Sequence, residues 1–568
     1  MTMDLNILIG GAAGQGVHAI TSPLAKTLVR RGCQALVTLS YESRIRGGHI
    51  FNKIRLSDQP LISSREGVDL LVALNQETVD LHRGKLSAGG IIIYDADLVK
   101  KAPEGASSLA LFLEALLPGT KAGEIAVNAG ACGAVLGLLK VPVEPMLELL
   151  TETFAAKGPE VVEWNRQAAR RGFELASAQE YPLSLAGITP TPEPRLLING
   201  HEALALGALA AGIQFVSGYP MTPWSSLLNA VGQRAAKYRV VVEQAEDEIA
   251  AINMAIGASF AGARALTGTS GGGFCLMTEA LGLAAMSETP LVIVLSQRPG
   301  PSTGLPTRTS QGDLGFSLNA GQDDFPRAVL APGTPAQGFG LMAKALNLAD
   351  RYQIPVFVLT DQYFADTQFT HTAPEFPPVE IDRALTFGPA AAPYERYAIT
   401  PDGISPRRLP GFGPELVVSD SDEHTPDGHL TEDLKVRVQM HEKRLRKLKG
   451  LAGELGGITT AGPPDAPVTL LCWGSSLGPV QEAAARLEGE KIPARVVHLS
   501  ELWPFPGEAL ASALGRPRKL VAVELNATGQ LNRLMRQETG RAADHLVLKY
   551  DGLPFTPEYI LRELKSFI

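Results

Sequence analysis

The strongest constraint on the fold of this chain is a pattern that recurs in three blocks, in which short apolar runs alternate with longer helical stretches. The apolar runs are NILIG, QALVTLS, VDLLVAL and GGIIIYD in the first block, QFVSG, RVVVEQ, ARALTG and PLVIVLS in the second, and VTLLCWG, ARVVHLS, KLVAVEL and HLVLKYD in the third. Runs of this length that alternate with helices are typical of α/β folds with largely parallel sheets. The pattern therefore predicts three α/β domains, the second of them doubly wound.

Changes in composition mark the borders between these domains. A proline-rich stretch, GITPTPEPRL, indicates an extended linker after the first block. Prolines, an acidic stretch (SDSDEHTPDGH) and a basic helix (HEKRLRKLKG) precede the third block and are expected to wrap a surface as a long connector. We expect a first domain over 1–186, a second over 197–370, a connector over 371–467 and a third domain over 468–568.

Charge and hydropathy exclude several classes of protein. The 568 residues include 51 Lys and Arg against 59 Asp and Glu, and a formal net charge of −8 does not suit a general nucleic-acid binder. The apolar runs are too short, and too often broken by Gly or Pro, to span a bilayer. Because no basic segment precedes the first apolar run, we expect no secretory signal and a cytoplasmic protein.

The cysteines give no sign of a metal centre. Cys33, Cys132, Cys275 and Cys472 lie far apart, and none of them forms a CxxC pair. A zinc site or an iron–sulfur cluster built from this chain alone is therefore not expected, and we predict four buried, reduced thiols.

A glycine-rich turn, GGAAGQG, follows the first predicted strand and opens a helix. It places Gly14 and Gly16 where helix N–H groups could bind a phosphate. The spacing is not GxGxxG, and Glu42, beside Arg44 and Arg46, lies farther on than the carboxylate of a nicotinamide site would. A structural tight turn and a contact to a phosphate or pantetheine group both remain open.

The segment SGYPMTPWSSLL lies between a strand and a helix of the second block. It predicts Thr222 as the N-cap and Pro223 as the first helical residue. A small carboxylate could bind the unpaired backbone donors at this helix end, together with the Thr222 hydroxyl. An ordinary cap without a ligand is the alternative.

An acidic cluster in VVVEQAEDEIAAINMAIGASFAGA begins the next helix. It contains Glu243, Glu246, Asp247 and Glu248, and such a cluster can be no more than a favourable acidic first turn. Glu248, however, enters a helix lined by small residues that let other backbones approach closely. A carboxylate there would be partly desolvated and suited to general acid–base chemistry.

These segments together resemble one family. They are GGAAGQGV, RIRGGH, HEALALGALAAGIQFVSGYPMTP, EDEIAAINMAIGASFAGARALTGTSGGG, QRPGPSTGLPTRTSQGDL, WGSSLGPVQEA, ELWPFP and VELNATGQL, in this order. The chain resembles the 2-oxoacid:ferredoxin oxidoreductases, specifically the alpha subunit with the gamma domain fused at its N-terminus, and most of all the 2-oxoglutarate type. The resemblance implies a gamma-type domain, a pyrimidine-binding domain for thiamine diphosphate and a transketolase C-terminal-like domain.

The resemblance assigns roles to residues of the second domain. Glu248 precedes Gly257 by nine residues (257 − 248), the spacing of the glutamate that activates the aminopyrimidine of thiamine diphosphate. Thr222 in YPMTP would bind the 2-oxoacid carboxylate, and Tyr219 and Pro220 would line the cofactor site. An arginine of the following loop should pair with the substrate, and among the two candidates the family favours Arg308 over Arg298.

The resemblance also implies partners. The chain contains no GDG motif and no grouped cysteines, so a beta subunit is expected to bring Mg²⁺ and a [4Fe–4S] cluster in an α₂β₂ heterotetramer. The reaction would be the reversible, coenzyme A-dependent oxidative decarboxylation of 2-oxoglutarate to succinyl-CoA and CO₂, with electrons passed to ferredoxin, as in the reductive tricarboxylic acid cycle. Gly14, Gly16, Arg44 and Arg46 would contact coenzyme A, and the third domain would be structural and could serve as a docking surface.

Three alternatives stay open at this point. One is an enzyme of the same family that acts on pyruvate or another 2-oxoacid. The second is a nicotinamide-dependent dehydrogenase that uses the N-terminal glycine-rich turn. The third is a non-catalytic scaffold that only positions a catalytic partner.

Overall fold

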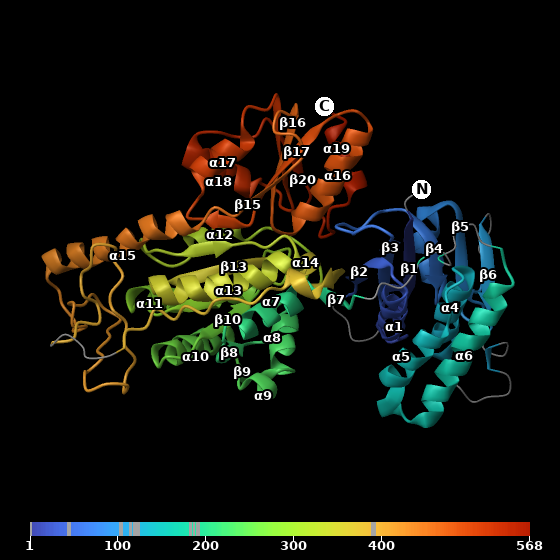
Figure 1. Ribbon diagram of the computed structural model, residues 1–568, viewed down its shortest axis with the longest axis horizontal. Helices are drawn as coiled ribbons and strands as arrows, with labels where there is room; N and C mark the ends of the chain where they lie inside the picture. Colours follow the sequence, from blue (N-terminus) through green and yellow to red (C-terminus); the bar gives the residue numbers. More distant parts are fainter. Residues whose placement is uncertain are drawn as a thin grey trace. The chain divides into compact units, whose positions relative to one another are not determined.

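The computed structural model describes residues 3–42, 47–101, 106–112, 116–117, 125–180, 185, 188, 193–387 and 393–568. The chain forms two compact units, Met1–Ile198 with Thr367–Glu375, and Asn199–Asp366 with Phe376–Ile568 (Figure 1). The first unit contains one sheet and the second unit contains two. The α/β class expected from the apolar runs is thus present in all three sheets, while the domain boundaries drawn from composition remain predictions.

The first unit is built on an eight-stranded sheet in the order β6-β5-β4-β1-β3-β2-β14-β7. Its strands are β1 (Asp4–Ala12), β2 (Gln34–Ser40), β3 (His49–Ser57), β4 (Val68–Ala73), β5 (Leu86–Asp95), β6 (Ser107–Leu111), β7 (Arg195–Asn199) and β14 (Gln368–Thr372). Its α-helices in the described residues are α1 (Val17–Arg30), α2 (Gln76–His82), α4 (Ile125–Leu138), α5 (Glu144–Phe154) and α6 (Pro159–Ser177). Apolar residues of β1, α1 and α4 pack together in the main core of this unit.

The expectation of a largely parallel first sheet is wrong. Strands β1, β4, β5 and β6 pair in parallel, but β3 pairs antiparallel with β1 and β2, and β14 pairs antiparallel with β2. The cause is the short connection between β2 and β3, because a parallel pair needs a crossover of a dozen or more residues. Strand β3 (HIFNKIRLS) interleaves polar with apolar residues, and the search for apolar runs missed it.

The second unit begins with a seven-stranded sheet in the order β18-β12-β13-β11-β10-β8-β9. Its strands are β8 (Phe215–Gly218), β9 (Val241–Gln244), β10 (Ala265–Thr269), β11 (Leu291–Gln297), β12 (Ala328–Leu330), β13 (Pro355–Asp361) and β18 (Glu501–Trp503). All neighbours pair in parallel except β18, which lies antiparallel to β12. The accompanying helices are α7 (Gly200–Ala210), α8 (Ser225–Gly232), α9 (Ala235–Tyr238), α10 (Glu248–Phe260), α11 (Gly271–Met286), α12 (Leu314–Asn319), α13 (Pro335–Tyr352) and α14 (Gln362–Asp366).

Helices cover both faces of this sheet, as the doubly wound pattern predicted (Figure 1). Val292 and Val294 of β11 face one core, which α7, α8 and α13 complete. Ile293 and Leu295 of the same strand face the other core, which contains α10 and α11. Because β11 is buried on both faces, its first five residues (LVIVL) are continuously apolar rather than alternating.

The third sheet has five strands in the order β15-β17-β16-β19-β20. Its strands are β15 (Ile458–Ala461), β16 (Val468–Trp473), β17 (Ala494–Leu499), β19 (Lys519–Glu524) and β20 (His545–Leu548). Its helices are α16 (Leu477–Gly489), α17 (Gly507–Leu514), α18 (Gln530–Thr539) and α19 (Pro557–Leu564). The four predicted strands are present, and β15 adds an antiparallel edge to them.

The connector contains the predicted basic helix as α15 (Leu434–Glu454). Two of its lysines, Lys443 and Lys447, are fully buried and each lies 2.5 Å from a carboxylate oxygen of buried Glu288. Asp350 accepts from Arg264 and from the connector residues Arg383 and Arg407 at 2.8–2.9 Å. The connector is therefore fixed to the second domain by buried ion pairs rather than lying loosely over it.

Two expectations about composition can be compared with the structure. Cys33, Cys132 and Cys472 are buried thiols as predicted, but Cys275 is exposed, because it lies on the outer face of α11. Among the described residues, no helix has the length and apolar character required to cross a membrane.

Candidate active site

Three polar segments of the second domain follow strands β8, β10 and β11. These strands are parallel neighbours, so their carboxyl ends meet at one edge of the sheet. Thr222 follows β8, Ser270 follows β10 and Arg298 follows β11. The carboxyl edge of an open α/β sheet is where ligands bind in such folds, and the structure gathers the predicted residues there.

Glu248 is the first residue of α10 and is 3% exposed. The preceding Asp247 is the N-cap, and its side chain accepts from the Ala250 N–H at 2.7 Å. The other predicted acids, Glu243 and Glu246, are exposed. The acidic cluster therefore divides into one cap, two solvated carboxylates and a single buried carboxylate, which is Glu248.

A narrow cradle holds the Glu248 carboxylate. Oγ1 of Thr269 donates to Oε1 of Glu248 at 3.3 Å. A Cβ on Gly273, in the first turn of α11, would lie 2.1 Å from Thr269 Oγ1 and 2.3 Å from Glu248 Oε1. Only glycine fits at position 273, because any side chain would push the carboxylate or the hydroxyl away.

The predicted cap at Thr222 is wrong in its details. Helix α8 begins at Ser225, so neither Thr222 nor Pro223 belongs to it, and Trp224 occupies the N-cap position. The Thr222 carbonyl oxygen accepts from Nη1 of Arg298 at 2.8 Å instead of from a helical N–H. Thr222 is therefore held in a turn before the helix, half-buried at the edge of the sheet.

Trp224 fixes this turn, and the sequence analysis did not single it out. Its fully buried indole lies against Gly218 at the end of β8 and Gly268 in β10, where a Cβ would come within 2.6 Å and 2.3 Å of indole atoms. The sulfur of Met221 accepts from Ser270 Oγ at 2.7 Å. The YPMTPW segment is thus packed onto the strand ends on both sides of Thr222.

Arg298 links the turn that contains Thr222 with the buried carboxylate of Glu248. It is half-buried, it donates to Thr222, and its buried Nε has no hydrogen-bond partner in the described part of the chain. Burial lowers the pKa of Arg298, and the negative charge of Glu248 opposes that shift. The arginine therefore lies in the electrostatic field of Glu248 as well as in contact with Thr222.

Asp313 is a second carboxylate at this edge, and the sequence analysis missed it. A Cβ on Gly271, the first residue of α11, would lie 2.8 Å from Asp313 Oδ2, which is buried and has no hydrogen-bond partner among the described residues. The Asp313 N–H donates to Oε1 of Gln297 at 3.0 Å. Burial raises the pKa of the Asp313 carboxyl to about 6, so this group changes charge near neutral pH.

Comparisons with known proteins agree with this arrangement. A family model described as pyruvate flavodoxin/ferredoxin oxidoreductase, thiamine diphosphate-binding, matches residues 206–443. A second, pyruvate ferredoxin/flavodoxin oxidoreductase, matches 6–175, and the transketolase C-terminal domain matches 463–530. The alpha subunit of 2-oxoacid:ferredoxin oxidoreductase 2 from Aeropyrum pernix is 32% identical over 97% of this chain and 96% of its own length.

The chain belongs to the alpha subunits of the 2-oxoacid:ferredoxin oxidoreductases. The 2-oxoglutarate oxidoreductase subunit KorA of Mycobacterium tuberculosis is 32% identical over 99% of this alpha subunit and 91% of its own length. A solved structure, the 2-oxoglutarate:ferredoxin oxidoreductase of Magnetococcus marinus with 2-oxoglutarate, coenzyme A and succinyl-CoA bound, covers 99% of both chains with a TM-score of 0.91 and 32% identity. The resemblance and the three-domain α/β class are thereby confirmed.

Other predicted residues of the alpha subunit lie around the cluster or outside it. Tyr219 and Pro220 are exposed beside Thr222, and Gly257 is exposed on α10. Arg308 is half-buried and lies against Gly552 of the third domain, where a Cβ would come within 3.0 Å of Arg308 Cβ. A hydrogen bond ties Arg298 to Thr222.

The glycine-rich turn of the alpha subunit has its own internal hydrogen bonds. Gly14 and Gly16 have φ values of 97° and 81°, which favour glycine. The Ala12 N–H donates to the Gln15 side chain at 2.6 Å, and the Ala13 N–H donates to a backbone carbonyl at 3.1 Å. These bonds account for the turn without a ligand. The predicted coenzyme A contacts Arg44 and Arg46 lie outside the described residues.

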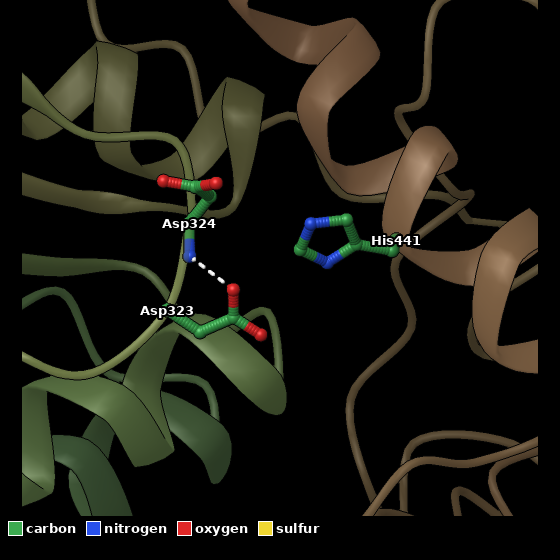
Figure 2. A group of neighbouring side chains, drawn as sticks. All are labelled: Asp323, Asp324 and His441. Carbon is green, nitrogen blue, oxygen red and sulfur yellow. Dashed lines mark hydrogen bonds between the residues drawn. The ribbon is translucent and has the colours of Figure 1, made fainter.

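A group of candidate metal ligands lies elsewhere in the alpha subunit. Figure 2 shows Asp323 and Asp324 on one loop facing His441 of α15. Both aspartates are exposed, and Asp323 already pairs with Arg437 at 2.7 Å. Because a guanidinium competes for the same carboxylate, this group does not fit a structural metal ion, and we assign none to it.

Proposed function

We propose that the chain is the alpha subunit of a 2-oxoglutarate:ferredoxin oxidoreductase. The enzyme converts 2-oxoglutarate, coenzyme A and oxidised ferredoxin to succinyl-CoA, CO₂ and reduced ferredoxin, and the reaction is reversible. The observation that carries the substrate assignment is the match over 99% of both chains to an enzyme solved with 2-oxoglutarate and succinyl-CoA. The KorA relative supports the same substrate.

The cradle around Glu248 fits the aminopyrimidine of thiamine diphosphate. Glu248 is buried, and within the described part of the chain it receives one hydrogen bond, from Thr269 to Oε1, which leaves the other oxygen for a ring nitrogen. When bound, thiamine diphosphate supplies a carbon nucleophile and an electron sink for the 2-oxoacid carbonyl. Glu248 holds and exchanges a proton at the ring nitrogen, while Tyr219 and Pro220 line the same site.

Thr222 and an arginine hold the carboxylate of the substrate. The Thr222 hydroxyl donates one hydrogen bond, and a guanidinium can add two parallel ones. In this proposal Arg308 binds the substrate carboxylate. Arg298 holds Thr222 in place by donating to its backbone carbonyl.

A beta subunit completes the site. The chain has no GDG motif and no grouped cysteines, so Mg²⁺ and a [4Fe–4S] cluster belong to the partner in an α₂β₂ assembly. The faces of α10 and α11 next to Glu248 carry exposed apolar residues, namely Ile249, Met254 and Leu276. A Cβ on Gly257 or Gly272 in these two helices would meet nothing closer than 3.6 Å, so another chain can approach them closely.

Coenzyme A, ferredoxin and location complete the proposal. The first domain contributes to coenzyme A binding through Gly14, Gly16, Arg44 and Arg46, and ferredoxin receives electrons from the cluster of the beta subunit. The assembled enzyme works in the cytoplasm.

The test is reconstitution with the beta subunit. The purified complex should reduce a viologen dye with 2-oxoglutarate and coenzyme A, and omission of coenzyme A should abolish the steady rate. Pyruvate should give a much lower kcat/KM than 2-oxoglutarate. A preference for pyruvate would overturn the substrate, and dye reduction by this chain alone would overturn the division of the site between subunits.

A further inference from the structure

Residues 309–315 of the second domain, which we call the substrate-loop strap, form one of the contacts between the second and third domains. The strap lies between Arg308, at the end of the exposed loop 299–308, and helix α12. We infer that Gln311 and Gln530 are positioning residues that fix the strap on the third domain and so hold the substrate loop at the active site. The inference deepens the proposed function and rests on it.

Gln311 anchors the middle of the strap and is fully buried. Its N–H donates to the Leu525 carbonyl at 2.7 Å, and its Nε2 donates to the Trp473 carbonyl at 2.8 Å. Its Oε1 accepts from the Leu525 N–H at 3.0 Å and from Ser476 Oγ at 3.1 Å. Nδ2 of Asn526 donates to the Gln311 carbonyl at 3.2 Å. One residue of the second domain is thus bound by four residues of the third.

Gln530 binds the end of the strap that is farther from Arg308 along the chain. Its Nε2 donates to the Gly312 carbonyl at 2.7 Å, and its Oε1 accepts from the Gly315 N–H at 2.9 Å. Both of these bonds join the half-buried Gln530 side chain to the strap. The Gln530 side chain therefore holds a segment that comes from the second domain.

The part of the third domain that receives the strap is itself rigidly bonded. Buried Glu524 accepts from the backbone N–H groups of Leu531 and Asn532 at 2.8 Å and 3.0 Å. Oδ1 of Asn526 accepts from the Gln530 N–H at 3.3 Å. The VELNATGQL motif that the sequence analysis quoted only as a family marker thus forms a fixed platform for the strap.

Two side chains, Arg308 just before the strap and Asp313 within it, link the strap to the proposed active site. Arg308 precedes it, and Asp313 within it lies against Gly271, at the start of the helix that carries Gly273 over Glu248. A shift of the strap would therefore move the proposed substrate arginine and the Asp313 carboxylate relative to Glu248. Displacements of about 1 Å at such groups are enough to weaken substrate binding.

The test is Gln530→Ala in the complex with the beta subunit. We expect KM for the 2-oxoacid to rise about tenfold with a smaller change in kcat, because binding geometry is lost while the cofactor chemistry is kept. Gln530→Glu keeps the acceptor for Gly315 and should recover part of the KM. The matched control is Gln537→Ala. Gln537 is an exposed glutamine of the same helix, and its side chain donates to neighbouring Glu538.

Two results would overturn the inference. One is an unchanged KM in folded Gln530→Ala, and the other is the same KM change in Gln537→Ala. Hydrogen exchange of the Gln311 and Gly315 amides gives a readout that does not need activity: exchange should be faster in Gln530→Ala and unchanged in Gln537→Ala. If the wild-type complex oxidises no 2-oxoacid, the proposed function fails, and unaltered exchange in Gln530→Ala would separately refute the positioning.

Discussion

Nη1 of Arg298 donates to the carbonyl oxygen of Thr222 at 2.8 Å and so joins the end of strand β11 to the turn after β8. The same guanidinium lies in the field of Glu248, which opposes the effect of burial on its pKa. One cation therefore connects the residue proposed to bind the substrate carboxylate with the carboxylate proposed to act on the cofactor. The lysine and glycine variants below separate these roles.

Arginine-to-lysine variants distinguish the two candidate substrate arginines. Arg308→Lys keeps the charge but loses the planar fork, so KM for the 2-oxoacid should rise about tenfold or more, while the Kd for thiamine diphosphate changes little. Arg298→Lys removes the donor to Thr222 and should raise KM less. Steady-state kinetics of the two complexes give the answer, and the opposite order of effects would assign the substrate carboxylate to Arg298.

The glycine over Glu248 provides a steric test. Gly273→Ala places a Cβ 2.3 Å from Glu248 Oε1, so the carboxylate must move and turnover should fall by about tenfold or more. The control is Gly340→Ala on the exposed face of α13, where a Cβ meets nothing within 4 Å, and it should leave turnover near that of the wild type. Equal activity of the two variants would show that the cradle does not set the position of Glu248.

Asp313 should make stability depend on pH. Burial raises its folded-state pKa to about 6 from the ordinary 3.8, so between these values the folded chain binds more protons than the unfolded chain. Stability is then lost as the pH rises through this window, by at most about 3 kcal/mol. Asp313→Asn cannot ionise, so its Tm should exceed that of the wild type by more at pH 7.5 than at pH 4.5. A Tm difference that does not vary with pH would contradict the assignment.

The ion pairs of the connector should be costly to break on one side. Glu288→Gln leaves Lys443 and Lys447 buried without their carboxylate, which should destabilise the chain by about 3–5 kcal/mol. Thermal unfolding measures the loss. Glu279→Gln on the exposed face of α11 is the control and should shift Tm little, and a similar small shift in Glu288→Gln would mean that the buried cluster adds no stability.

The fold was predictable where a strand can be recognised from its own apolar sequence. The strands at the centres of the second and third sheets are continuous apolar runs, because both of their faces are buried. Strands β3, β14, β15 and β18 were missed because they are short, interleaved with polar residues or at sheet edges, and three of them pair with segments distant in the sequence. A pattern in the neighbouring sequence cannot reveal a strand partner that lies so far along the chain. Strands β6, β7, β12 and β13 were not predicted either, although β13 (PVFVLTD) has the same apolar signal as its neighbour β11.

The residues of the candidate site also divide into those with a local sequence signal and those without one. Glu248 could be singled out because an acidic residue entering a helix of small residues is a local feature. Asp313, Trp224 and Gln311 could not, because each acts through contacts with strands or loops far along the chain. The cap at Thr222 was mispredicted because its carbonyl bonds Arg298, a partner that a helix-start pattern does not reveal.

In the proposed function, Glu248 holds and exchanges a proton on the cofactor of a 2-oxoacid oxidoreductase. This role is measured as the coenzyme A-dependent reduction of viologen by 2-oxoglutarate in the complex of Glu248→Gln with the beta subunit, beside Glu246→Gln, the exposed acid two residues earlier. We expect Glu248→Gln to assemble normally but to lose turnover by about 10²–10⁴-fold, while Glu246→Gln keeps it. Near-normal turnover in assembled Glu248→Gln, or a comparable loss in Glu246→Gln alone, would contradict this role.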